Sequence, residues 1–386
     1  MTTVRLPRAD RSLLRYDVRS QHRFPERAAP ARSRRALAAA HVVVDPLADV
    51  APDARPVIDW EATLRFRHHL WGLGLGVAEA MDTAQRGMGL DWETSRELIR
   101  RTGAEARRTG GDLVCGAQTD HLSPGSARGL DEIVDAYQGQ CAAVEEAGGQ
   151  VVLMASRELC RIARSADDYL DVYHRVLGGL RRPALVHWLG EMFDPALAGY
   201  WGAEDLDVAT ETLARLLEAE APRVDGIKIS VLEQRREVEL RRRLPAGMRM
   251  YTGDDYHYPA MIGGDGEHHS DALLGAFDVI APAAAASLAA LDAGDGATFQ
   301  AVLAPTLPLA RHVFGTPTYY YKTGIVFLAY LNGHQSHFRM VRGLESGRSV
   351  VHLAEAFRLA DQADLLRDPE LATERLGHVL ALAGID

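Results

Sequence analysis

Short apolar runs rich in β-branched residues alternate with longer helical stretches from about residue 40 onward. Short runs of this kind fit parallel strands with both faces buried, and the longer stretches fit helices that cover such a sheet. The predicted strands cover residues 41–45, 77–82, 112–116, 150–154, 184–188, 224–230, 249–253 and 277–281. Eight strand–helix repeats predict an α/β fold, a (β/α)8 TIM barrel.

Helical windows between these strands cover residues 60–71, 92–108, 130–147, 167–177 and 208–219. Asp91 and Asp207 directly precede two of the windows. A short acidic side chain there can accept hydrogen bonds from the free N–H groups of the first helical turn, so both are predicted N-caps.

Two further segments flank the predicted barrel. Residues 1–35 form a basic N-terminal arm with ten arginines and three acids, which we expect to lie over its own domain or a partner subunit. The barrel itself is assigned to residues 36–295. Residues 296–386 are predicted to be a C-terminal helical extension, with helices over 297–314, 319–331, 349–359 and 369–382.

Composition narrows the class of protein. A net charge of −10 argues against a general nucleic-acid binder. The sequence has no apolar run of the roughly 18 to 20 residues that a membrane span needs, and its start lacks the apolar core of a signal peptide. Cys115, Cys141 and Cys160 have no paired spacing, which favours a reduced, cytoplasmic setting.

Lysine is almost absent: only Lys228 and Lys322 occur among 43 basic residues. Arginine cannot lose its proton in a protein, whereas a desolvated lysine can become a neutral, nucleophilic amine. Lys228 lies on a predicted strand, and we interpret it as a Schiff-base former. Lys322 lies in a helical stretch beside Tyr319, Tyr320 and Tyr321, and we interpret it as structural.

Polar residues recur where the predicted strands end, and the active site of a (β/α)8 barrel lies at those carboxyl ends. We therefore predict that these side chains bind the substrate: Asp82, Thr83, Gln85, Gln118, Ser156, Arg157, Glu191, Ser230, Asp254 and Asp255. Imine catalysis also needs a proton shuttle, and His187, at the end of the fifth strand, is the predicted one because imidazole titrates near neutral pH.

Several motifs resemble the dihydrodipicolinate synthase/N-acetylneuraminate lyase family. Gly226-Ile227-Lys228 is similar to the Gly-Ile-Lys strand of that family, and Gly253-Asp254-Asp255 follows 25 residues after Lys228, as the family's Gly-Asp-Asp does. Weaker similarity extends over residues 41–333. The resemblance implies a class I lyase or aldolase on a barrel with extra C-terminal helices, dimeric or tetrameric, in which Lys228 forms the imine. It implies no cofactor and no bound metal.

The sequence also departs from the family pattern. The family's Gly-Thr-Thr-Gly-Glu turn holds a 2-keto acid carboxylate, but the matching stretch here runs from Asp82 to Arg86 and keeps only Thr83. The family's relay tyrosine aligns with His187. These differences suggest imine chemistry on a small carbonyl compound other than pyruvate. The expected reaction makes or breaks a C–C bond, or removes water, in another keto acid or in a keto-sugar or keto-polyol.

Two alternatives remain open on the residues. The first is a metal-dependent barrel lyase or isomerase, because His187, Glu191, Asp254, Asp255, His257 and residues 267–269 supply possible ligands. The second is a non-catalytic sugar-binding module that reaches nucleic acid through the basic arm.

Overall fold

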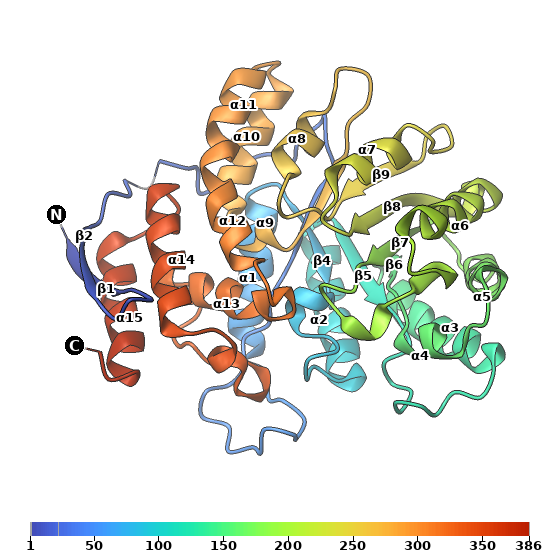
Figure 1. Ribbon diagram of the computed structural model, residues 1–386, viewed down its shortest axis with the longest axis horizontal. Coiled ribbons are helices and arrows are strands. Elements are labelled where there is room, and N and C mark those ends of the chain that lie inside the picture. Colours follow the sequence, from blue (N-terminus) through green and yellow to red (C-terminus); the bar gives the residue numbers. More distant parts are fainter. Residues whose placement is uncertain (1, 22, 386) are drawn as a thin grey trace.

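A closed barrel of parallel strands forms the centre of the computed structural model, which describes residues 2–21 and 23–385 (Figure 1). The strands pair in the order β10-β3-β4-β5-β6-β7-β8-β9. Their bounds are β3 Ala36–Ala39, β4 Gly76–Glu79, β5 Leu113–Ala117, β6 Gln150–Leu153, β7 Ala184–Leu189, β8 Val224–Ser230, β9 Arg249–Thr252 and β10 Asp271–Leu274. The predicted (β/α)8 barrel is confirmed.

Helices surround the barrel and connect its strands, as expected for right-handed βαβ crossovers. They are α1 Trp60–Gly72, α2 Trp92–Thr109, α3 Leu130–Glu146, α4 Arg157–Ile162, α5 Ala166–Gly178, α6 Leu206–Ala219, α7 Gln234–Arg241, α8 Tyr258–Gly263, α9 Ala276–Val279 and α10 Ala281–Asp292. Asp91 caps α2 as predicted, with its carboxylate 2.7 Å from the Thr94 N–H. The cap of α6 is Asp205 rather than Asp207.

The first and eighth strands are not where the sequence predicted them. Residues 41–45 contain three β-branched valines and are mostly buried. The ladder to β4 and β10 nevertheless runs through the alanine-rich Ala36–Ala39, and the valines follow that strand as loop. Similarly, the predicted strand 277–281 belongs to α9 and α10, and the eighth strand is Asp271–Leu274. Strand pairing on both sides outweighs local propensity at these two positions.

The chain after α10 is helical, as predicted. It forms α11 Gly296–Leu303, α12 Leu307–Val313, α13 Tyr321–Leu331, α14 Val350–Gln362 and α15 Pro369–Leu382, with a 3-10 segment η7 at Val341–Gly347. These helices lie together on one side of the barrel (Figure 1). Every residue of α13 is buried, so this helix lies at the centre of the C-terminal group.

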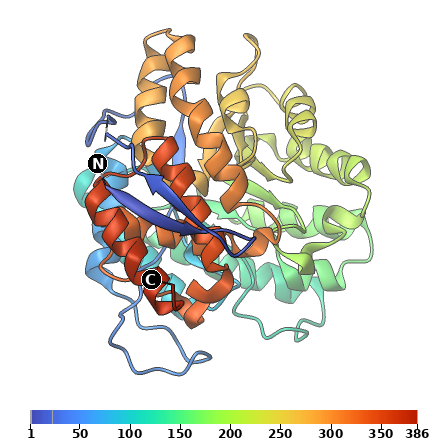
Figure 2. The same cartoon turned by 60° about the vertical axis from the view of Figure 1, so that its left-hand side comes forward.

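The arginine-rich N-terminal arm forms a two-stranded hairpin, β1 Thr3–Pro7 and β2 Leu13–Asp17, which lies across the C-terminal helices (Figure 2). The Tyr16 hydroxyl donates to Asp361 of α14 at 2.7 Å, and the backbone N–H groups of Arg19 and Ser20 donate to the same carboxylate. The arm therefore packs on its own chain, as expected.

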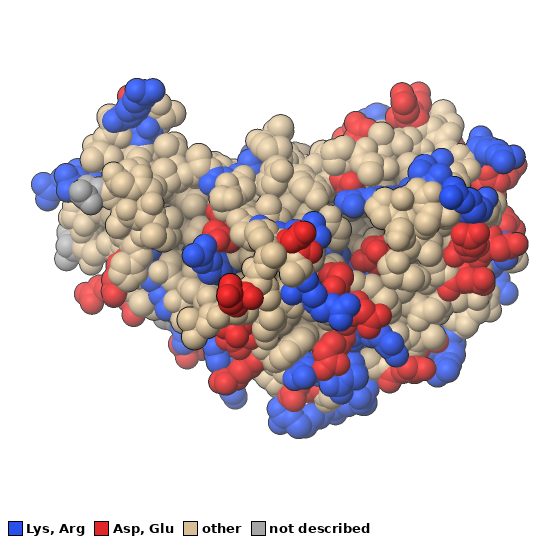
Figure 3. Space-filling view, turned by 90° about the horizontal axis from the view of Figure 1, so that it is seen from below, with Lys and Arg blue, Asp and Glu red and all other residues tan. Residues whose placement is uncertain are grey.

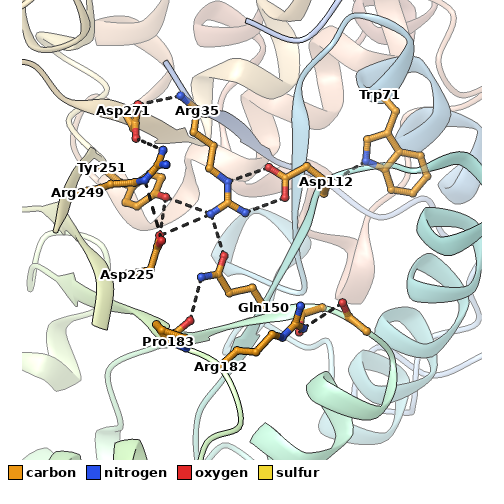
Figure 4. A network of polar contacts seen from close by, with 12 residues as sticks. Arg35, Trp71, Asp112, Gln150, Arg182, Pro183, Asp225, Arg249, Tyr251 and Asp271 are labelled. Carbon is orange, nitrogen blue, oxygen red and sulfur yellow. Dashed lines mark hydrogen bonds and ion pairs between the residues drawn. The ribbon is translucent and has the colours of Figure 1, made fainter. Parts of the chain in front are cut away.

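Arg35, the last residue of the arm, closes the amino-terminal end of the barrel (Figure 4). Its guanidinium donates two hydrogen bonds to Asp112, at 2.7 and 2.8 Å, and further bonds to Gln150 at 2.8 Å and to the Tyr251 hydroxyl at 3.1 Å. Tyr251 in turn donates to Asp225 at 2.8 Å. With this end filled, the opposite end, where the strands terminate, is the one that a ligand can reach.

No helix in residues 2–21 and 23–385 is long and apolar enough to cross a bilayer. On the face drawn in Figure 3, acidic and basic side chains lie intermixed. Ion pairs between near neighbours on a helix, such as Arg100 with Glu97 and Arg175 with Asp171, are of the kind that produces such a pattern.

Candidate active site

Lys228 projects into the barrel from the sixth strand of the ring, β8. Its register partners are His187 on β7 and Tyr251 on β9, and Tyr251 belongs to the cluster of side chains that fills the interior. Lys228 is 8% exposed and His187 is fully buried. The Lys228 Nζ lies 3.1 Å from His187 Nε2, and that same nitrogen lies 3.2 Å from the Ser230 hydroxyl. Lys228, His187 and Ser230, predicted separately, are therefore in contact.

Gly253, the residue after β9, packs closely against Ser230 and Lys228. A Cβ at this position would lie 2.1 Å from Ser230 Oγ, 2.7 Å from the Ile229 carbonyl oxygen and 3.0 Å from Lys228 Cε. No larger residue fits, so the first glycine of Gly253-Asp254-Asp255 has a steric reason to be there.

The protonation of the pair is set by burial. Burial lowers the pKa of Lys228, although the carboxylates of Asp82 and Asp255 oppose the shift. Burial also lowers the pKa of His187 well below its usual range, and the neighbouring ammonium adds to that effect. His187 Nδ1 has no hydrogen-bond partner among the described residues. Burial and the neighbouring ammonium both disfavour the imidazolium, so His187 is held neutral. The proton-shuttle role predicted for it, which was based on titration near neutral pH, stays a prediction.

Asp255 is the group beside Lys228 whose protonation changes near neutral pH. Burial raises its pKa to about 7, against the opposing effects of the hydrogen bond from the Ala276 N–H, at 2.9 Å, and of Lys228. Asp254 is also buried, but it turns away toward His257 Nδ1, at 2.8 Å, and the Tyr256 N–H, at 2.8 Å. The two neighbouring acids therefore have different surroundings and can have different roles.

The second lysine lies at the same end of the barrel, which the sequence interpretation missed. Lys322 is 2% exposed, and its Nζ donates to the Tyr319 carbonyl oxygen at 3.1 Å. The ammonium sits 4.9 Å from the ring centre of Tyr319 and 4.6 Å from that of Tyr321. Burial lowers the pKa of Lys322 to about 8, opposed by Asp82 and Asp194. Asp82 thus acts on both lysines of the chain.

Helix α13 reaches the barrel through the turn that carries Asp82. This turn is the 3-10 segment η1, Asp82–Ala84. The Thr83 hydroxyl lies 2.8 Å from the Tyr321 hydroxyl, and the Tyr321 ring stacks on Phe314 with ring centres 4.3 Å apart. Thr83 and Tyr321 are both almost fully buried. The one residue kept from the family's turn is therefore one of the contacts between the barrel and its C-terminal helices.

Two other predicted site residues, Gln85 and Ser156, already form hydrogen bonds within the protein. The Gln85 side chain donates to and accepts from the backbone of Val341, both at 3.2 Å. Ser156 caps α4 and contacts Thr119 Oγ1 at 2.5 Å. Their polar groups are satisfied internally, which leaves little for a substrate.

The remaining predicted residues lie toward the surface. Arg157 pairs with Asp194 at 2.7 Å and is 45% exposed. Gln118 is half-buried, and its backbone N–H donates to Gln140. Glu191 is exposed and makes no ion pair within the described chain, so the structure does not bring it to Lys228.

The candidate ligands of the metal-dependent alternative do not converge. Within residues 2–21 and 23–385, no group of three or more His, Cys, Asp or Glu side chains is arranged to hold a metal ion. Residues 267–269 lie on an exposed loop, as expected.

The closed barrel and the added C-terminal helices form the fold that dihydrodipicolinate synthase structures also have, as the motifs suggested. The chain belongs to the family described as "Protein of unknown function (DUF993)", whose model matches residues 4–385. None of the curated proteins matches the sequence.

Solved structures confirm the fold. YagE, a prophage protein of the dihydrodipicolinic acid synthase family from E. coli K12, solved with pyruvate, superposes with a TM-score of 0.65 at 13% identity, over 86% of this chain and 99% of that one. The 4-hydroxy-tetrahydrodipicolinate synthase of Methylacidiphilum fumariolicum SolV gives 0.61 at 15% identity, with 86% and 99% covered. Dihydrodipicolinate synthase from Oceanobacillus iheyensis gives 0.58 at 12% identity, with 91% and 97% covered.

Proposed function

We propose that this protein is a Schiff-base lyase or aldolase that makes or breaks a carbon–carbon bond in a hydroxylated carbonyl compound of the keto-sugar or keto-polyol class. The observation that carries the proposal is the state of Lys228. Its amine is buried, forms no ion pair among the described residues, and has the neutral His187 as its hydrogen-bond partner. A lysine held in this way is neutral part of the time and can attack a carbonyl carbon.

The proposed chemistry uses two groups. The Lys228 amine adds to the substrate carbonyl, and the carbinolamine loses water to give an iminium ion. The bond between the α and β carbons then breaks, its electron pair moves into the iminium to form an enamine, and the β-hydroxyl proton passes to a base as the second carbonyl forms. Asp255 is the proposed base, because its pKa of about 7 suits proton transfer near neutral pH. Protonation of the enamine carbon and hydrolysis of the imine release the first product.

The substrate class follows from Asp82. Its carboxylate occupies the turn in which the family that this chain resembles binds the carboxylate of a 2-keto acid, and it makes no hydrogen bond or ion pair among the described residues. A second carboxylate placed beside it would be repelled in a partly buried site. Hydroxyl groups, by contrast, can donate to Asp82.

Trapping of the imine tests the proposal directly. Wild-type protein is incubated with sodium borohydride and either dihydroxyacetone or pyruvate, then digested and mapped by mass spectrometry. With only two lysines, a modified side chain can be assigned without ambiguity. We expect a reduced adduct on Lys228 that forms more readily with dihydroxyacetone and is absent in Lys228→Arg and Lys228→Met.

Two outcomes would contradict the proposal. Absence of an adduct with every carbonyl tried would exclude imine chemistry. Faster trapping of pyruvate than of dihydroxyacetone would exclude the proposed substrate class. The homodimer or homotetramer expected from the family resemblance, and the cytoplasmic location, stay predictions. Sedimentation of the purified chain and fractionation of cells would test them.

A further inference from the structure

Lys322 is a buried cation with too few partners. An ammonium group has three N–H donors, and among the described residues only the Tyr319 carbonyl oxygen accepts from it. Two aromatic rings contribute cation–π contacts, but no carboxylate of the described chain lies within ion-pair distance of the Nζ. Removing a charge from water at such a site is costly unless something else satisfies its donors.

The buried arginines differ from Lys322, because each of them forms an ion pair with a carboxylate. Arg67 pairs with Glu79 at 2.8 Å, Arg86 with Asp120 at 2.5 Å, Arg236 with Asp207 at 2.8 Å and Arg241 with Asp265 at 3.4 Å. Each has a carboxylate in direct contact. Lys322 and Lys228 are the exceptions, and they lie at the same end of the barrel.

Asp82 is the carboxylate whose charge acts on both lysines. It is nevertheless in ion-pair contact with neither. The hydrogen bond between Thr83 and Tyr321 fixes the turn of Asp82 against the start of α13, which carries Lys322. A hydroxylated substrate needs both donors and acceptors, and Lys322 and Asp82 have N–H groups and carboxylate oxygens that no contact within the described chain uses.

We propose that Lys322 is a substrate-binding residue that donates hydrogen bonds to a hydroxyl oxygen of the substrate, next to the carbon that bonds to Lys228, while Asp82 accepts from the hydroxyl protons. The inference rests on the proposed function, since it needs the substrate to be held on Lys228. It assigns to the C-terminal helices a part in choosing the substrate.

The test compares two carbonyl compounds that differ only in their hydroxyl groups. Borohydride trapping on Lys228 is measured against concentration for dihydroxyacetone and for acetone, in wild-type protein, Lys322→Met and Lys322→Arg. We expect wild-type protein to prefer dihydroxyacetone, and Lys322→Met to lower the ratio of the two trapping efficiencies roughly tenfold, the usual effect of losing a hydrogen bond to a charged donor. Lys322→Arg should restore part of the preference.

A pH series on wild-type protein supplies a second measurement that needs no variant. Because Lys228 reacts in both trapping experiments, its own titration cancels in the ratio. The groups that face Lys322 are Asp82, Asp194, Arg157, Tyr319 and Tyr321. Burial raises the pKa of both tyrosines, and it also raises the pKa of Asp82, whereas it lowers the pKa of the Lys322 amine to about 8. The preference for dihydroxyacetone should therefore decline as the pH rises through about 8.

The outcomes separate the two proposals. An adduct on Lys228 whose preference is the same in Lys322→Met and constant across the pH series would overturn the role of Lys322 and leave the proposed function standing. An equal loss with both compounds in Lys322→Met, together with a flat pH series, would show that Lys322 is structural. A wild-type protein that forms no adduct at all would overturn both.

Discussion

Thr83 and Tyr321 are 238 positions apart in the sequence, and their hydroxyl groups lie 2.8 Å from each other in the interior. Thr83 belongs to the turn after the second strand of the ring, and Tyr321 begins α13. This contact joins the end of the barrel that carries Lys228 to the C-terminal helices.

Removing this hydrogen bond should cost stability. In Tyr321→Phe the Thr83 hydroxyl loses its buried partner, and we expect the free energy of unfolding in urea to fall by about 1 to 3 kcal/mol. The control is Tyr320→Phe, whose hydroxyl has no hydrogen-bond partner among the described residues and whose side chain is half-buried. Equal effects of the two substitutions would contradict the importance of the Thr83 contact.

Adding a methyl group at Gly253 should disrupt the site. Gly253→Ala places a carbon against Ser230 and the Ile229 carbonyl oxygen, so we expect a loss of stability of about 1 to 3 kcal/mol and reduced trapping on Lys228. Gly139→Ala is the matched control, because Gly139 lies inside α3 with nothing within 4 Å of its added Cβ. The control should gain about 0.5 to 1 kcal/mol in thermal or urea unfolding. A Gly253→Ala variant as stable as wild type would contradict the close packing of Gly253 against Ser230 and Lys228.

Asp255 should give the stability a particular pH dependence. Its pKa of about 7 in the folded state exceeds the unfolded value of 3.8, so its protonated form favours folding, and that stabilisation is lost as the pH rises from about 4 through 7. Asp255→Asn cannot ionise. The free energy of unfolding of the variant minus that of wild type should therefore be larger at pH 8 than at pH 5, which means that the variant is relatively more stable at pH 8. A difference that stays constant between these pH values would show that Asp255 does not titrate there.

The buried ion pair of Arg67 with Glu79 should be essential to the barrel. Both side chains are fully buried, and Glu79 also accepts from Thr102 and from the Ala80 N–H. Arg67→Met leaves the carboxylate without its cation, and we expect a loss of about 3 to 5 kcal/mol in chemical denaturation. Arg65→Met, on the same helix, breaks only an exposed pair with Glu61 and should cost less than about 0.5 kcal/mol. Similar losses in the two variants would contradict this assignment.

The sequence pattern predicted most of the barrel because parallel strands buried on both faces have a simple signature. Val224–Ser230 and Pro369–Leu382 match their predicted bounds. The failures lie at the seam where the first and last strands pair. Ala36–Ala39 has no β-branched residue, and only its neighbours β4 and β10 make it a strand.

The candidate site was predicted less completely, for a different reason. Scarcity of lysine identified Lys228, and the same signal was available for Lys322, but its helical context gave no indication that α13 returns to the barrel. Gln85 and Ser156 had the right position along the chain, yet their polar atoms bond to backbone groups or to neighbouring side chains. Which polar groups remain free depends on contacts between distant segments, and a linear pattern does not contain them.

Arg35 makes the end of the N-terminal arm part of the barrel structure, which the arginine-rich composition of the arm does not indicate. Shortened forms that start at or beyond residue 36 would leave the carboxylate of Asp112 without its two hydrogen bonds from Arg35 and would remove a cation 3.6 Å from Asp225. Anyone preparing a trimmed version of this protein should therefore retain that arginine, because it joins side chains from β9 and from the starts of three other strands of the ring.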